Sequence, residues 1–161
     1  MIGEQDVGHL RRCVELAGEA VDAGDDAFGS VLVSADGEVL KEERNRISSG
    51  DDTRHPEFEL ARWAAENMTP EQRRVATMYT SGEHCPMCAA AQAWVGIGRI
   101  VYASSSRQLT EWLTELGAPA SRVRPLAIED VILDTVIEGP VPQFSEDLRA
   151  LHARRHAQAM R

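Results

Sequence analysis

The chain has few cysteines, few aromatic residues and fewer basic than acidic residues. Its three cysteines are too few for a disulfide-stapled scaffold, and two of them belong to one Cys-x-x-Cys motif. Seventeen lysines and arginines stand against 26 aspartates and glutamates, which gives a net charge of −9. Proteins that hold nucleic acids usually neutralise several phosphates with basic side chains, so this balance argues against a nucleic-acid partner.

Long hydrophobic runs, internal repeats and low-complexity segments are also missing. The sequence shows no candidate membrane span and no leader or lipidation pattern, so we expect no membrane association and a reducing, cytoplasmic environment. With 161 residues and 43% hydrophobic content, the chain suits one domain over residues 1–161, whose core needs no disulfides.

Two short motifs carry chemistry: His-Pro-Glu, which begins at His55, and Cys-Pro-Met-Cys, from Cys85 to Cys88. An imidazole and two thiolates are a common ligand set for tetrahedral Zn²⁺, and three protein ligands leave a fourth position for water. We therefore predict a catalytic zinc site bound by His55, Cys85 and Cys88, with Glu57 beside it. For either motif alone, the alternatives are a structural zinc half-site, a redox pair or an ordinary core histidine.

The spacing of these residues constrains how they meet. Inside a helix, His55 and Glu57 would point about 200° apart, so they converge only near a helix N-terminus. Cys85 and Cys88 lie one turn apart on one helix face, and a helix start favours their thiolate forms. Residues 51–53 supply cap-type side chains for the first of these helices. The sequence thus predicts two helix N-termini that face one ion.

Such a site suits hydrolysis. A bound Zn²⁺ lowers the pKa of its water toward neutrality and supplies hydroxide at ordinary pH. Glu57 would take a proton from that water and return it to the substrate. Attack on an amidine-like ring carbon with loss of ammonia is the expected use, because this pair of motifs is typical of zinc-dependent base deaminases.

Hydrophobic patterning predicts alternating helices and strands. Helices are expected over residues 4–23, 55–67 and 85–94, a hairpin over 29–42, and strands over 75–81 and 100–103. A helix then carries Leu109 to Leu116, residues 131–137 suit a strand or a packed helix, and a final helix places Phe144, Leu148 and Leu151 in register. Such alternation makes a sheet covered by helices, with sites at strand ends.

Two predictions concern individual core residues. We expect Cys13 to be a small buried hydrophobe on the first helix. On the 85–94 helix we expect the core side to be formed by Met87, Ala90, Ala91 and Trp94.

Several stretches resemble one known family. Ala27 to Val33, Asn45-Arg46, Thr53 to Glu57 and Tyr79 to Ala89 are similar to the cytidine deaminase superfamily, in its branch of bacterial guanine deaminases and tRNA adenosine deaminases. The resemblance runs from about residue 7 to about residue 155. It implies a three-layer α/β/α sandwich with a central mixed five-stranded sheet, a zinc hydrolase and a homodimer.

The resemblance also implies residue roles. The predicted zinc ligands match those of the family, and Glu57 matches its proton shuttle. Asn45 corresponds to an asparagine that hydrogen-bonds the base. Phe28 falls where the family lines its pocket, so its ring would stack on a heterocycle; simple core packing is the alternative.

Two positions depart from the family pattern. Pro56 stands where alanine is common, and proline suits the first turn of a helix because its missing N–H would have no partner there. His84 stands where proline usually precedes the first cysteine. Its ring would either contact the substrate at the pocket rim or point outward behind the zinc ligands.

The C-terminal segment, residues 139–161, is expected to close over the active site, as in guanine deaminase relatives. Within it, Phe144 and Glu146 are candidate substrate-binding residues, Glu146 as a second proton carrier or a base contact. The alternative for Glu146 is an exposed acid that favours a helix start.

These observations predict a zinc-dependent hydrolytic deaminase of a small amino-heterocycle, a free base or nucleoside of guanine, cytosine or aminotriazine type. A tRNA adenosine deaminase is the alternative within the family, and the acidic balance argues against it. A catalytically silent zinc-binding module is the third hypothesis. Glu57 argues against it, because a structural site needs no proton shuttle.

Overall fold

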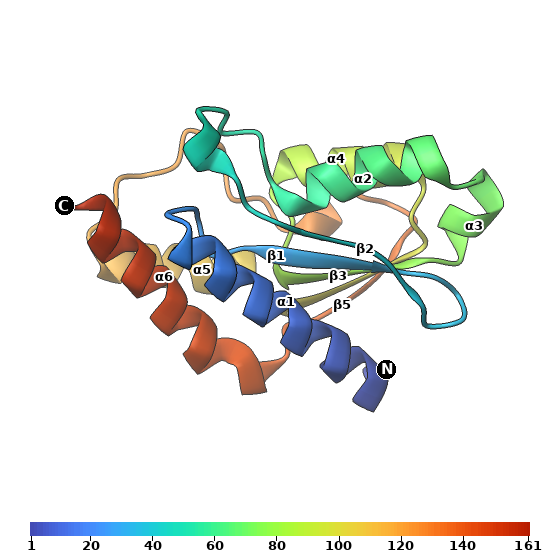
Figure 1. The fold of residues 1–161 in the computed structure, drawn as a ribbon, viewed down its shortest axis with the longest axis horizontal. Helices are drawn as coiled ribbons and strands as arrows, with labels where there is room; N and C mark the ends of the chain where they lie inside the picture. Colours follow the sequence, from blue (N-terminus) through green and yellow to red (C-terminus); the bar gives the residue numbers. More distant parts are fainter.

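The computed structural model, which describes residues 1–161, has a five-stranded sheet between two layers of helices (Figure 1). The sheet has the order β2-β1-β3-β4-β5, with β1 (Gly29–Val33), β2 (Val39–Arg44), β3 (Thr77–Gly82), β4 (Arg99–Ser104) and β5 (Val136–Glu138). β1 is antiparallel to β2 and β3, whereas β3, β4 and β5 are parallel. The predicted mixed sheet in an α/β/α sandwich is confirmed.

The helices are divided between the two faces of the sheet. One layer holds α1 (Glu4–Asp22), α5 (Ser106–Glu115) and α6 (Ser145–Ala159), and the other holds α2 (Pro56–Asn67), α3 (Pro70–Arg74) and α4 (Pro86–Val95). Short 3-10 turns at Ile47–Ser49, Ile128–Asp130 and Pro142–Phe144 lie in the connections. None of the helices combines the length and apolar character that crossing a bilayer requires.

Strand alternation gives each layer its own core. In β1, Val31 packs on the α1 side while Leu32 packs on the α2 side. In β4, Val101 and Ile100 divide in the same way. Because successive strand residues point to opposite faces, the continuous apolar run of each buried strand contributes side chains to both cores.

Helix α1 lies directly on β1 at Gly29. A Cβ at this position would come within 2.4 Å of the Leu16 Cβ and 2.5 Å of the Cys13 carbonyl oxygen, so only glycine fits. Cys13 is fully buried, as predicted. The close approach holds the strand that carries Ser30 against the rigid face of α1.

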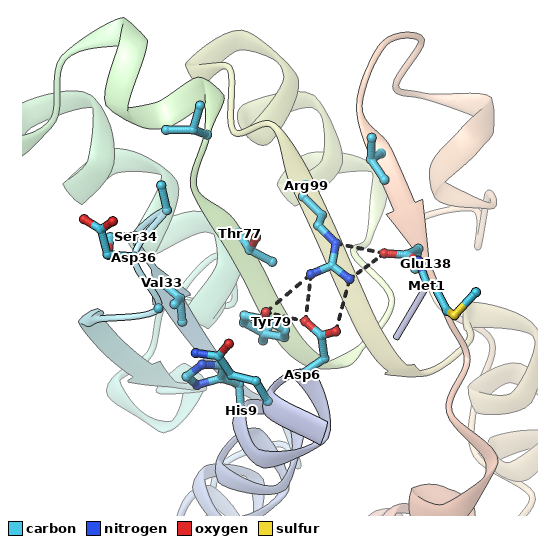
Figure 2. Close-up of a pocket in the computed structure, with 15 residues that line it drawn as sticks. Met1, Asp6, His9, Val33, Ser34, Asp36, Thr77, Tyr79, Arg99 and Glu138 are labelled. Carbon is cyan, nitrogen blue, oxygen red and sulfur yellow. Dashed lines mark hydrogen bonds and ion pairs between the residues drawn. The ribbon is translucent and has the colours of Figure 1, made fainter. Parts of the chain in front are cut away.

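An ionic network closes the end of the sheet where β3 and β4 begin (Figure 2). Arg99 donates to Asp6 Oδ1 at 2.7 Å and to Glu138 Oε2 at 2.8 Å, and Tyr79 Oη donates to Asp6 Oδ1 at 2.6 Å. Burial raises the pKa of Asp6, but the hydrogen bonds, led by that of Arg99, hold it well below its usual value. The network ties α1 to three strands, and its members Asp6, Arg99 and Glu138, which line a polar cavity of about 530 Å³, are paired with one another.

The predicted core face of α4 is wrong. The helix buries Cys88, Ala89 and Gln92, whereas Trp94 is 90% exposed. Because the cysteine face turns toward His55, the 3.6-residue period turns Trp94 away from the sheet. The metal motif, not the apolar content, therefore decides the orientation of this helix.

Candidate metal centre and active site

Two helix N-termini meet beside the carboxyl end of β3. His55 is the N-cap of α2 and Cys85 is the N-cap of α4, and a proline occupies the first helical position of each. Proline loses no hydrogen bond there, and its fixed φ suits the first turn. The cap-type residues 51–53 do not cap α2; Asp51 instead accepts hydrogen bonds from the amide and hydroxyl of Thr53 in the preceding turn.

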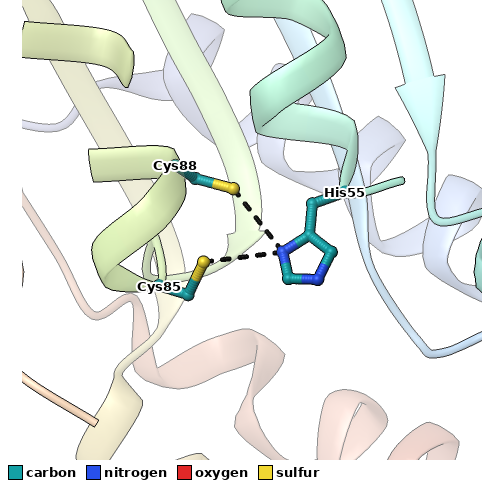
Figure 3. Close-up of side chains that lie close together, drawn as sticks. All are labelled: His55, Cys85 and Cys88. Carbon is teal, nitrogen blue, oxygen red and sulfur yellow. Dashed lines mark hydrogen bonds between the residues drawn. The ribbon is translucent and has the colours of Figure 1, made fainter. Parts of the chain in front are cut away.

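The side chains of the three predicted ligands converge (Figure 3). The Nδ1 atom of His55 lies 3.5 Å from the Sγ of Cys85 and 3.5 Å from the Sγ of Cys88, and the three donor atoms lie within 4.8 Å of one another. Tetrahedral zinc, with bonds of about 2.3 Å to sulfur and about 2.05 Å to nitrogen, requires an N–S separation of about 3.6 Å. The chemistry and spacing of the donors therefore fit Zn²⁺, with Nδ1 as the histidine donor.

Without a metal ion, the three donors share protons. The hydrogen bond with Cys88 lowers the pKa of Cys85 to about 4 despite its burial. The hydrogen bond with Cys85 raises the pKa of His55 to about 9, and the same thiolate, together with burial, raises the pKa of Cys88 far above its usual value. At neutral pH a Cys85 thiolate thus faces two protonated partners, and metal binding must displace both protons.

The carboxylate of Glu57 lies in the first turn of α2 and is only 4% exposed. Its Oε1 accepts a hydrogen bond from Thr80 Oγ1 at 2.8 Å, and Ser30 Oγ lies 2.9 Å from Thr80 Oγ1. If Ser30 donates to Thr80 and Thr80 to Glu57, each hydroxyl hydrogen is used once. Sequence analysis missed this pair, although a polar residue at the α2-facing position of two apolar strands was the available signal.

Two further side chains connect the elements of the site, and both were missed from the sequence. Gln92 Nε2 donates to the Glu57 carbonyl oxygen at 3.3 Å and so ties α4 to α2. The carboxylate of Glu83 accepts from the backbone amides of Ser106 and Ile128, both at 2.7 Å. Glu83 therefore joins the second metal motif to the start of α5 and to the turn at residues 128–130.

A cavity of about 400 Å³ opens beside the donor atoms. It is lined by His55, Glu57 and Cys85, by one side of α5, which begins beside Glu83, and by most of residues 118–125. The site lies after the carboxyl ends of the parallel strands β3 and β4, where open α/β sheets place their ligands.

Phe28 forms part of the cavity wall. Gly82 makes this possible, because a Cβ at Gly82 would lie 3.0 Å from the ring. The ring also meets His152 of α6 edge to face, with centroids 5.1 Å apart. Sequence analysis gave no role to His152, which carries no motif.

Asn45 and His84 are buried outside the cavity lining. The Oδ1 of Asn45 accepts from the amides of Asp26 and Ile47, each at 3.2 Å, and so braces its own loop. His84 fits neither of its two expected placements, at the pocket rim or pointing outward, because it is 1% exposed and neither ring nitrogen has a hydrogen-bond partner. Burial lowers its pKa.

The C-terminal segment also lies away from the cavity. Phe144 is 2% exposed within the core on the α1 side, and Glu146 is exposed in the first turn of α6. The buried side chains of α6, Leu148 and His152, direct the helix onto α1 and α5. Within one chain, residues 139–161 therefore flank the site and do not close over it.

Comparison with known proteins identifies the family. Residues 3–104, well over half of the chain, match the model of the cytidine and deoxycytidylate deaminase zinc-binding region. The chain belongs to this deaminase family. The matched region contains the three donors and Glu57, so the protein is a zinc-dependent hydrolase of the deaminase class.

Several relatives of this chain are named as deaminases, in agreement with the family match. A probable cytosine deaminase from Schizosaccharomyces pombe is 30% identical over 116 residues, which cover 72% of this chain and 70% of that protein. The guanine deaminase of Bacillus subtilis is 36% identical over 104 residues, which cover 63% of this chain and 66% of that protein. The solved structure of a guanine deaminase from Nitrosomonas europaea shares the fold, with a TM-score of 0.68 at 16% identity over 95% of this chain and 86% of that one.

Proposed function

We propose that this deaminase removes the exocyclic amine of a small amino-heterocycle by hydrolysis and releases ammonia, with His55, Cys85 and Cys88 holding Zn²⁺. The convergence of one imidazole nitrogen and two sulfurs beside a buried carboxylate, at the end of a cavity, carries the proposal. When bound, Zn²⁺ supplies a water of lowered pKa and positive charge for the transition state.

Glu57 is the proposed proton carrier. It would carry one proton from the attacking water to the ring nitrogen, and a second, from the hydroxyl then left on the attacked carbon, to the departing amine. The hydrogen bond from Thr80 fixes its Oε1, so the carboxylate keeps one orientation through both transfers. Phe28 offers apolar ring surface at the cavity wall, which a flat heterocycle can contact.

The proposed substrate is a free base or nucleoside of guanine, cytosine or aminotriazine type. The names of the two relatives, cytosine deaminase and guanine deaminase, support the first two rings. The net charge of −9 argues against a tRNA substrate, which remains the second candidate. A silent zinc module is disfavoured, because such a module needs neither the cavity nor the buried Glu57.

Two further properties belong to the proposal. A homodimer is supported by large apolar side chains at the surface, above all Trp94, which is 90% exposed, and Leu133, which is 97% exposed. Sedimentation equilibrium at micromolar concentration tests it. The thiolate donors fit a reducing cytoplasm, where such cysteines stay unoxidised.

The experiment is an ammonia-release screen of the zinc-loaded protein with guanine, cytosine, aminotriazines and their nucleosides. Glu57→Gln should lower kcat by about a thousandfold, because the general acid–base step is lost, while zinc content and Tm stay close to wild type. Glu66→Gln, at an exposed position of the same helix, is the matched control.

The proposal fails if none of these rings releases ammonia. It also fails if Glu57→Gln loses its zinc, since Glu57 would then hold the metal. Inosine formation in an anticodon stem-loop would instead establish the tRNA alternative.

A further inference from the structure

The cavity is longer than the ring that the proposed function places in it. The reacting carbon must lie beside Glu57 and the donors, at one end. Along the wall, α5 contributes residues from Ser106, whose amide bonds Glu83, to Thr114, a rise of about 12 Å, and residues 118–125 then lead the chain back toward Ile128, whose amide also bonds Glu83. A pyrimidine or purine positioned for reaction therefore occupies one end and leaves the other unfilled.

The unfilled end is lined mainly by carbon. We call it the apolar arm, and define it by Leu109, Leu113, Ala118, Pro119, Ala120 and Val123. The hydroxyl groups of Thr110 and Thr114, which also line it, donate to the carbonyl oxygens of Ser106 and Thr110 at 2.9 and 2.7 Å. Their hydrogens are therefore committed to the helix and do not serve a ligand.

Arg124 is the one charged side chain at this end of the cavity lining. It is exposed, so water hydrates its guanidinium and screens its attraction for an anion. A sugar or phosphate placed in the arm would lose hydrogen bonds to water and gain only contacts with carbon, which is unfavourable for polar groups. An apolar group placed there would gain from leaving water.

The arm lies outside the part of the chain that matches the family. That match ends at residue 104, and every residue of the arm comes after it. Metal chemistry and the apolar arm are therefore built from different parts of the sequence.

We propose that the substrate is an amino-heterocycle that carries an apolar substituent of several carbons, and that the apolar arm binds this substituent. The inference rests on the proposed function, because it uses the ring position set by Glu57. It adds a substrate class: alkyl- or aryl-substituted bases, in preference to bare bases and to nucleosides.

The test compares matched substrates on the zinc-loaded protein: 1-methylcytosine with 1-butylcytosine, and 9-methylguanine with 9-butylguanine. A buried methylene contributes about a fourfold gain in kcat/KM, so three of them, in an arm partly open to solvent, should give at least about a tenfold gain. The gain should appear in KM, because the substituent binds equally in the ground and transition states.

Variants locate the effect. Leu113→Asn should reduce the butyl-to-methyl ratio of kcat/KM to below about threefold, and Val75→Asn, at a 59% exposed apolar residue outside this cavity, should keep the wild-type ratio. Ala120→Asp, in the exposed part of the arm, is the second variant if Leu113→Asn does not fold. Unchanged ratios in both arm variants would overturn the inference.

A charged analogue separates the two ligand chemistries. Replacing the butyl group by a 3-carboxypropyl group of similar length should abolish the gain. If the carboxylate outperforms butyl, Arg124 governs this end of the cavity, and the apolar assignment is overturned.

The outcomes also separate this inference from the proposed function. If parent bases and methyl derivatives release ammonia but chain length has no effect, only the inference fails. If no compound reacts, the proposed function fails, and calorimetric binding of 1-butyluracil against 1-methyluracil still tests the arm. Equal affinities for those two compounds would overturn it.

Discussion

The carboxylate of Glu57 is held by a cross-strand pair of hydroxyls. Ser30 on β1 and Thr80 on β3 are direct partners in the antiparallel register, and both are fully buried. Their side chains therefore point to the same face, beneath the first turn of α2, where Thr80 reaches the carboxylate at 2.8 Å. A hydrogen bond to a charged group in a buried place contributes about 1.5–3 kcal/mol, enough to decide the orientation of Glu57.

Removing one hydroxyl should show this positioning role. Thr80→Val keeps the side-chain volume but removes the shorter hydroxyl contact to Glu57 Oε1 and leaves only Ser30 Oγ, at 3.3 Å. We therefore expect kcat to fall about tenfold to a hundredfold, with little change in KM or zinc content. Thr80→Ser restores the hydroxyl and should recover most of kcat. Steady-state kinetics and elemental analysis check the pair of variants, and a loss shared equally by Thr80→Ser would point to packing instead.

The metal donors make a second prediction at the residue scale. Because His55 has a pKa raised to about 9 and that of Cys88 is raised further, both carry protons at pH 7 before zinc binds. Zinc binding should release about two protons at pH 7, and the apparent affinity should fall as the pH is lowered. Titration calorimetry in buffers of different ionisation enthalpy measures the release, and a value near zero would contradict this proton distribution.

At the scale of elements, the sequence predicted the metal donors and most helices and strands, because ligand chemistry and hydrophobic period are local properties. It did not predict the orientation of α4, which depends on where His55 lies. It also left residues 131–137 undecided, and only β5 (Val136–Glu138) forms there. The short helix α3 (Pro70–Arg74), with its own capping box at Thr69, was not expected either.

The part of the cavity wall formed by residues 118–125 was not predicted, for a related reason. Residues 118–125 contain no motif and no regular period, and they reach the cavity only because α5 returns the chain to the end of the sheet. The C-terminal segment was expected there instead. Its position is set by apolar packing of Leu148 against a core that only the folded sheet creates.

Glu83 links these elements and can be tested. Glu83→Ala removes the acceptor of two backbone amides, at Ser106 and Ile128, and should lower the free energy of unfolding by about 2–3 kcal/mol. Because α5 and the turn at residues 128–130 then lose their connection to the metal motif, we expect a rise in KM with zinc content retained. Urea unfolding and steady-state kinetics measure the two effects. An unchanged KM would show that Glu83 does not help to position α5 and residues 118–125 for substrate binding.

At the scale of the whole molecule, buried histidines set the response to acid. Burial lowers the pKa of His152 to about 4, so this ring is neutral in the folded protein at pH 7. In the unfolded chain its pKa is about 6.5. The corresponding stability is full above pH 6.5 and is lost as the pH falls toward 4, by up to about 3 kcal/mol.

Tm measured between pH 7 and pH 4.5 tests this linkage. The wild type should lose stability steadily over this range, whereas His152→Phe, which keeps an aromatic contact with Phe28, should show a clearly flatter profile. Parallel profiles for the two proteins would assign the acid sensitivity elsewhere, to His84 in the first place, whose pKa burial also lowers.

Residues 118–125 form a wall without being part of either core. Near its ends this stretch is fixed by two contacts, from the Ala118 amide to the Leu113 carbonyl oxygen and from the Ile128 amide to Glu83. If the apolar arm binds the substituent as proposed, substitutions between those contacts would change which substituents bind without touching the metal donors or Glu57. The specificity of such an enzyme could therefore diverge through the seven exposed residues 119–125 while the zinc ligands and the proton carrier stay the same.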